Sequence, residues 1–115
     1  MKLLLFFLSS LSCSIALASS QWRVEEVYAY EIRSSIIEFQ VASGGCTHKS
    51  DFTLRLKRNR LNHVNDLLLI RERPDYCYAY IPSGTIIGYS YSELGLPPDA
   101  PVAIRNPTRE VRSGY

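Results

Sequence analysis

The sequence predicts an all-β protein, a small antiparallel β-sandwich or barrel with one short helical turn and a single disulfide. About seven short segments alternate apolar and polar residues and are separated by turn residues, which is the pattern of half-buried strands. The chain has 115 residues, of which 46% are hydrophobic and 21% charged. This length and composition allow one modest globular domain and exclude a two-domain enzyme or a disordered chain.

The first eighteen residues have the features of a secretory leader. Lys2 is followed by an unbroken apolar run, and Ala16 and Ala18 provide small residues at positions −3 and −1 of a cleavage site. The segment is too short and too polar to span a membrane well. We therefore predict cleavage after Ala18, a secreted or periplasmic location without a membrane span, one β domain over residues 19–105 and a polar tail over 106–115. Cys13 leaves a lipid-tethered envelope protein as the alternative.

The cysteines outside the leader form one even pair. An oxidising compartment favours pairing of Cys46 with Cys77, and thirty residues lie between them. A metal site built from these two cysteines with His48 and His63 is the competing interpretation, but its spacing matches no compact zinc pattern. We therefore predict a Cys46–Cys77 disulfide, no metal and no cofactor.

Three strands are expected in the first half of the domain. In residues 23–33, alternation places Tyr28, Tyr30 and Ile32 on one side and Val27 on the other. Residues 36–43 and 51–58 alternate more regularly, and each directs three apolar side chains to one face, which are Ile37, Phe39 and Val41 in the first and Phe52, Leu54 and Leu56 in the second. The polar face of the second of these strands is basic.

The middle of the chain allows two interpretations. Residues 59–66 contain three asparagines and an aspartate, which favours a turn between two strands, and residues 67–70 then read as a strand buried on both faces. Leu61, Val64 and Leu68 also fall at helical spacing, so an amphipathic helix is the alternative.

The remaining elements are short. Residues 76–81 and 85–91 are expected as strands joined by a turn at 82–84, and the last strand is expected around Val102 and Ile104. Ser90 and Glu93 have the spacing of a capping box, and Gly95 can close one helical turn before Pro97.

Few residues suggest catalysis. His48 and His63 lie in segments expected to be loops, and neither is near a nucleophile motif, while residues 43–46 lack the length and lysine of a phosphate loop. The acidic residues that could form a carboxylate pair are interpreted as a solvated face; they are Glu25, Glu26, Glu31 and Glu38. A small hydrolase is therefore the least favoured of the functions considered.

Two surfaces are candidates for binding a protein or glycan partner. Tyr76, Tyr78 and Tyr80 share one face of an expected strand, and Tyr89 and Tyr91 extend that row if two strands pair. The alternative is that these rings pack into the core or cover its rim. Arg55 and Lys57 belong to a basic patch that suits an anionic partner, although such residues also protect edge strands. Nucleic acid is a poor fit for an exported chain. We therefore predict a small exported, disulfide-stabilised binding protein, with the identity of the partner and the oligomeric state left open.

Overall fold

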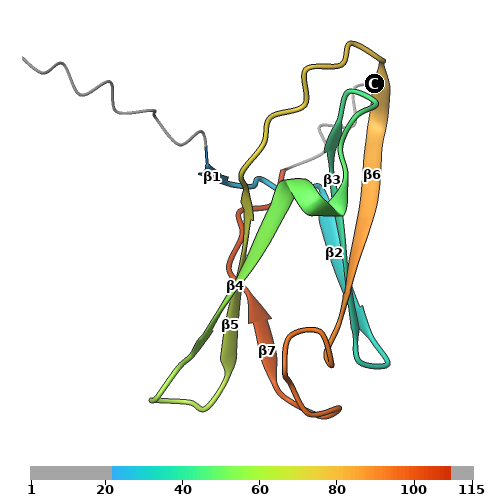
Figure 1. Ribbon diagram of the computed structural model, residues 1–115. Helices are drawn as coiled ribbons and strands as arrows, with labels where there is room; N and C mark the ends of the chain where they lie inside the picture. The colour runs from blue at the N-terminus through green and yellow to red at the C-terminus, as the bar shows by residue number, and fades with distance from the viewer. Residues whose placement is uncertain (1–21, 110–115) are drawn as a thin grey trace, which may run out of the picture.

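Two facing β-sheets form the domain in a computed structural model that describes residues 22–109 (Figure 1). The expected leader, the cleavage site, Cys13 and residues 110–115 of the expected tail lie outside the described residues. Within residues 22–109, no helical segment has the length and apolar character needed to cross a membrane.

The first sheet is built around β5 (Asn65–Arg71). The antiparallel strand β4 (Phe52–Arg58) lies along one side of it. Its other side is shared by the two-residue β1 (Arg23–Val24) and by β7 (Val102–Ile104), which pairs in parallel. The prediction of a turn between two strands is therefore confirmed, because β4 and β5 form an antiparallel hairpin, but the turn ends before Asn65, where β5 begins. The sheet is antiparallel except for β7.

The second sheet has the order β2-β3-β6 and is fully antiparallel. Its strands are β2 (Ala29–Arg33), β3 (Ile36–Ser43) and β6 (Ile81–Ser90). Ser34 and Ser35 form a two-residue connection between β2 and β3, and both have positive φ. Such a connection suits a tight hairpin whose twist matches the flanking strands.

The core lies between the two sheets and follows the predicted alternation. Ile37, Phe39 and Val41 of β3 are completely buried, as are Leu67 and Leu69 of β5. The apolar side chains of β4 become more exposed toward its end, because Phe52 is buried, Leu54 half-buried and Leu56 exposed. The interior is continuous along the sandwich, and further apolar residues from β6 and the loops complete it, namely Val27, Ile87, Tyr89, Tyr91 and Ala100.

The single strand expected over residues 23–33 is divided between the two sheets. β1 belongs to the first sheet and β2 to the second, with a bend at Tyr28 between them. Val27, expected on the polar side, is completely buried. The prediction of one continuous alternation over residues 23–33 was therefore wrong. A chain that crosses from one sheet to the other changes which of its sides faces the core.

The turn expected at residues 82–84 is instead part of β6. Pro82 is tolerated there because β6 pairs only with β3 among the described residues, and an edge strand has backbone groups that need no partner. The pairing register shifts between Val41 and Ser43, opposite this region. Gly84 has φ +65° and lies against the Val41 carbonyl oxygen, so a side chain there would collide with the neighbouring backbone. A β-bulge thus replaces the expected turn.

The short helical turn occurs at a different place from the one expected. A 3-10 turn spans Lys49–Asp51, and the Asp51 carboxylate accepts a hydrogen bond from the His48 backbone N–H at 2.8 Å. Residues 91–95 form turns without a helix. Ser90 and Glu93 nevertheless make the reciprocal hydrogen bonds of the expected capping box, at 3.2 and 3.3 Å.

Asn106 ties the end of the described chain to the first sheet. Its buried side chain accepts a hydrogen bond from Leu69 N–H at 2.7 Å and donates to the Glu25 and Leu69 carbonyl oxygens at 2.8 Å. Thr108 then forms a parallel bridge with Val27. The structured chain therefore continues past residue 105, where a polar tail was expected to begin.

Candidate functional site

The predicted disulfide joins two loops at one end of the sandwich. Cys46 and Cys77 are bonded, and their Cα atoms are 5.7 Å apart. Cys46 follows β3, whereas Cys77 lies in the connection from β5 to β6, which runs over the top of the molecule (Figure 1). This bond is compatible with an oxidising compartment. It fixes a long connection that contains three tyrosines.

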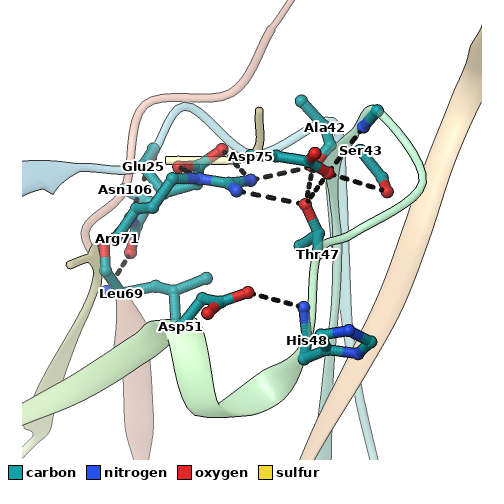
Figure 2. A network of polar contacts seen from close by, with 11 residues as sticks. Glu25, Ala42, Ser43, Thr47, His48, Asp51, Leu69, Arg71, Asp75 and Asn106 are labelled. Carbon is teal, nitrogen blue, oxygen red and sulfur yellow. Dashed lines mark hydrogen bonds and ion pairs between the residues drawn. The ribbon is translucent and has the colours of Figure 1, made fainter. Parts of the chain in front are cut away.

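Asp75 is the second anchor of this connection. One carboxylate oxygen accepts hydrogen bonds from the backbone N–H groups of Gly44 and Cys46 at 2.8 and 3.0 Å and from the Thr47 hydroxyl at 2.7 Å. The other oxygen accepts from the Cys77 N–H at 2.8 Å. Figure 2 shows Asp75 facing Thr47 and the loop after β3. A single carboxylate thus holds both loops that the disulfide joins.

The hydrogen bonds to Asp75 stabilise its charged form. The Thr47 hydroxyl and the backbone N–H groups of Cys77, Gly44 and Cys46 hold the Asp75 pKa well below its usual range, against the opposing effect of desolvation. A carboxyl with a lowered folded-state pKa adds stability above the unfolded-state pKa, about 3.9. That stability is lost as the pH falls through this value toward the folded-state pKa.

We therefore expect Asp75→Asn to remove part of the acid sensitivity of the fold. The amide cannot accept all the hydrogen bonds that the carboxylate accepts, so the free energy of unfolding falls at neutral pH and changes less between pH 6 and pH 3 than in the unchanged chain. Urea unfolding at the two pH values measures both effects. Asp99→Asn, at an exposed aspartate, is the matched control. An Asp75→Asn chain with the full acid-induced loss of stability would contradict this role.

A buried ion pair lies beneath the clamped loops. Arg71 Nε donates to a Glu25 carboxylate oxygen at 2.8 Å, and Nη2 reaches the other oxygen at 3.2 Å. Only 2% of Arg71 and 3% of Glu25 is exposed. The guanidinium also donates to the Ala42 carbonyl oxygen at 2.8 Å and to Thr47 Oγ1 at 3.2 Å (Figure 2), and it lies over the Phe52 ring. The Glu25 carboxylate is therefore part of the core, which corrects its expected place on a solvated face.

Thr47 connects the ion pair to the clamped loops. Its hydroxyl oxygen accepts a hydrogen bond from Arg71, and its hydroxyl group donates one to Asp75. One continuous network therefore runs from the first sheet to the connection that contains Cys77. The sequence contained no signal for this network, because its members come from five separate segments.

Three tyrosines project from the clamped connection. We call residues 76–80 the tyrosine segment. Tyr76, Tyr78 and Tyr80 are 72%, 100% and 91% exposed. The backbone between them is held, because Ala79 N–H donates to the Gly44 carbonyl oxygen at 2.9 Å and Cys77 is in the disulfide.

The segment forms no strand, and its side chains follow the predicted alternation only in part. The Cβ atoms of Cys77 and Ala79 both lie within 4 Å of the point that a Cβ atom on Gly45 would occupy. The three tyrosines are exposed and Cys77 is half-buried, but Ala79 is exposed as well, although it was expected on the inner side. The prediction of a strand over 76–81 was wrong, because residues 76–80 do not pair with another strand. Their backbone is held mainly by the disulfide and by the Asp75 carboxylate.

Tyr89 and Tyr91 do not extend this row. Both are buried in the core, and the Tyr89 ring meets Phe39 edge to face with centroids 6.1 Å apart. Burial, with a smaller effect of the Glu93 charge, raises the pKa of Tyr89 to about 12. These two tyrosines contribute to packing, and the binding candidate is reduced to the tyrosine segment.

The basic patch lies on a different part of the molecule. Arg55 and Lys57 point to the outer face of β4, an edge strand that pairs only with β5 among the described residues. The Arg55 guanidinium lies 5.7 Å from the centre of the Trp22 ring. The tyrosine segment follows the opposite end of β5, so the two candidate surfaces do not form one site.

Two adjoining cavities lie near the ion pair. The larger, about 400 Å³, is lined by Arg23, Tyr28, Pro74 and Asp75 together with the buried Arg71. The smaller, about 250 Å³, shares Arg23 and Tyr28 with it. Arg71 and Asp75 already direct their charges at protein partners, so the larger cavity offers a ligand few uncommitted polar groups.

No metal centre is assembled from the expected ligands in the described part of the chain. One group of possible ligand atoms occurs there, in Cys46, Asp75 and Cys77, and both sulfurs are used by the disulfide. His48 and His63 do not join this group. His63 lies in the β4–β5 turn with φ +58°, far along the chain from the clamped loops.

Comparison of the chain with protein-family models, with curated protein sequences and with solved structures found no match.

Proposed function

We propose that this protein is exported and binds another macromolecule, a protein in the first instance, through the tyrosine segment. The observation that carries the proposal is the combination of complete exposure at Tyr78 with a covalently fixed backbone at Cys77. Large aromatic side chains are enriched at protein interfaces, where they supply contact area and a hydroxyl for hydrogen bonding. A fixed backbone lowers the entropy lost on binding.

The arrangement also argues against a purely structural role for these rings. A tyrosine stabilises a fold by burying its ring, and Tyr78 and Tyr80 bury almost none of theirs. Asp75, the disulfide and the Ala79–Gly44 hydrogen bond all hold the adjacent backbone without covering the rings. Such a presentation suits a partner that supplies the missing contacts.

Export is the second part of the proposal. The leader-like residues 1–18 and the Cys46–Cys77 bond agree in pointing to an oxidising compartment, secreted or periplasmic. Mass measurement of the N-terminus of the natural product tests this part. A chain that begins at Ser19 supports cleavage after Ala18, and a chain that retains residue 1 contradicts it.

We expect Tyr78→Ala to abolish capture of the partner while leaving the melting temperature unchanged. The ring makes no core contact, so its loss removes interface area without removing stability. The chain from residue 19, with or without the substitution, serves as bait for native extracellular or periplasmic extract. Retained species are identified and then titrated in purified form.

Leu61→Ala is the matched control, because Leu61 is also almost fully exposed but lies in the β4–β5 turn. The proposal requires a species that is retained by the unchanged chain and by Leu61→Ala and lost with Tyr78→Ala. Equal retention by all three baits would contradict it. A retained species that resists protease but is removed by glycosidase would make the partner a glycan.

A further inference from the structure

The β2 strand forms an unusual edge of the second sheet. Among residues 22–109 it pairs with β3 alone, and every residue from Ala29 to Arg33 is exposed. Tyr30 and Ile32 stand opposite Phe39 and Ile37, so all four side chains share the core-facing side of the sheet. The β3 partners are completely buried, whereas Tyr30 and Ile32 are 44% and 39% exposed. The core-facing apolar surface therefore continues past the edge of the sandwich.

The backbone of β2 also has hydrogen-bonding groups that point away from β3. Arg33 and Ile36 flank the two-residue hairpin loop, a position whose backbone groups bond across the turn. Because such bonds alternate along an antiparallel pair, Glu31 and Ala29 also bond toward β3. The N–H and C=O groups of Tyr30 and Ile32 consequently point outward, toward a further strand.

The β4 and β6 edges carry features that discourage pairing with a second chain. The β4 edge has the cations Arg55, Lys57 and Arg58, which repel a second β4. The β6 edge contains Pro82 and the bulge at Gly84. β2 has neither a proline nor a bulge over residues 29–33, and it carries one acidic and one basic residue.

We propose that β2 pairs with the β2 strand of a second copy of this chain, around a two-fold axis at Glu31. The two three-stranded sheets then become one continuous six-stranded antiparallel sheet. In this register Tyr30 stands opposite Ile32 of the second copy, and the outward backbone groups of both residues bond to each other. Aromatic and β-branched residues form favourable cross-strand pairs.

The charges on the outer face fit this register. In the single chain, Arg33 Nε lies 3.6 Å from a Glu31 carboxylate oxygen, and Arg33 Nη2 lies 3.2 Å from a Glu38 carboxylate oxygen. In the pair, the two Glu31 carboxylates face each other, and each has an Arg33 of its own chain beside it and the Arg33 of the second copy diagonally across. Long side chains interact over such diagonals. The arginines thus offset the repulsion between the two carboxylates.

Glu31→Arg is the discriminating variant. It places two arginines opposite each other beside both copies of Arg33, while in the single chain it removes only an exposed ion pair. We expect the variant to self-associate at least about tenfold more weakly. Mixing the variant with the unchanged chain puts the introduced arginine opposite Glu31, so the mixture associates more tightly than the variant alone. Glu72→Arg, at an exposed loop position, is the control for added charge and is expected to have no effect.

Sedimentation of the disulfide-bonded chain from micromolar to millimolar concentration measures the association, and amide hydrogen exchange locates it. The proposal requires a dimer in which the amides of Tyr30 and Ile32 become protected as the concentration rises. A monomer throughout the range overturns it, as does a dimer that Glu31→Arg leaves unchanged. Protection of these amides that does not depend on concentration would assign the edge to the chain's own residues outside 22–109, and this result also overturns it.

Discussion

A chain with Cys46→Ser and Cys77→Ser is expected to unfold at a Tm lower by roughly 15 to 25 °C. The disulfide closes a loop with a sequence separation of 31, and its removal costs about 3 to 4 kcal/mol in the chain-entropy model. That is a large part of the about 5 to 15 kcal/mol that holds a small domain together. Thermal melting followed by far-ultraviolet circular dichroism measures the change.

Reduction of the unchanged chain provides the internal control. Added reductant lowers the Tm of the natural disulfide-bonded chain toward that of the double variant and leaves the double variant itself unaffected. Identical melting curves for the natural chain with and without reductant would show that the bond does not stabilise the fold. The same reduction frees Cys77, so we also expect the tyrosine segment to lose amide protection before the sheets do.

The second large effect is expected from Arg71→Met. The substitution leaves the Glu25 carboxyl group buried without its partner, and it removes the donors that serve Ala42 and Thr47. Breaking a buried pair in this way costs about 3 to 5 kcal/mol. Chemical denaturation at neutral pH measures the loss as a lower midpoint with an unchanged slope.

Two further variants separate burial from charge pairing. Glu25→Leu combined with Arg71→Met removes both charges together, so it is expected to recover much of the stability that Arg71→Met loses. Arg105→Met breaks the ion pair between Arg105, which is half exposed, and Asp66. We expect this variant to lower the free energy of unfolding by less than about 1 kcal/mol. Equal losses for Arg71→Met and Arg105→Met would contradict the importance of burial.

The parts of the fold predicted correctly are those fixed by local pattern. The alternation in β3, the hairpin between β4 and β5, and the short strand at Val102 all depend on neighbouring residues, and each was found in the sequence. The disulfide was predicted because only one pair of cysteines remains after the leader. Periodicity and simple counting were sufficient for these elements.

The errors occur where distant contacts override local preference. The segment Pro82–Gly84 reads as a turn, but pairing with β3 holds it in a bulged strand. Glu25 reads as a surface residue beside other glutamates, but it is buried because Arg71 lies opposite, 46 positions away. No property of either residue alone predicts this pairing.

The candidate site shows the same division. The exposed tyrosine rings and the half-buried Cys77 agree with the alternation predicted from spacing, whereas the exposed Ala79 does not. The burial of Tyr89 and Tyr91 agrees with the alternative of core packing. Spacing could not decide which tyrosines pack and which are exposed, because a buried tyrosine and a binding tyrosine look alike in a strand. The anchoring role of Asp75 was missed because the donors to its carboxylate come from the segment 43–47, at sequence separations of 28 to 32, and from its own turn.

The contacts made by Asn106 have a consequence for when the domain folds. This amide bonds to the Glu25 carbonyl oxygen across 81 positions, and Val27 meets Thr108 across the same separation. During synthesis, a chain that has not yet released residue 106 from the ribosome lacks the group that completes its first sheet. Contacts this distant in sequence also form slowly. Folding of this domain is consequently completed only after residues 106–108 are free.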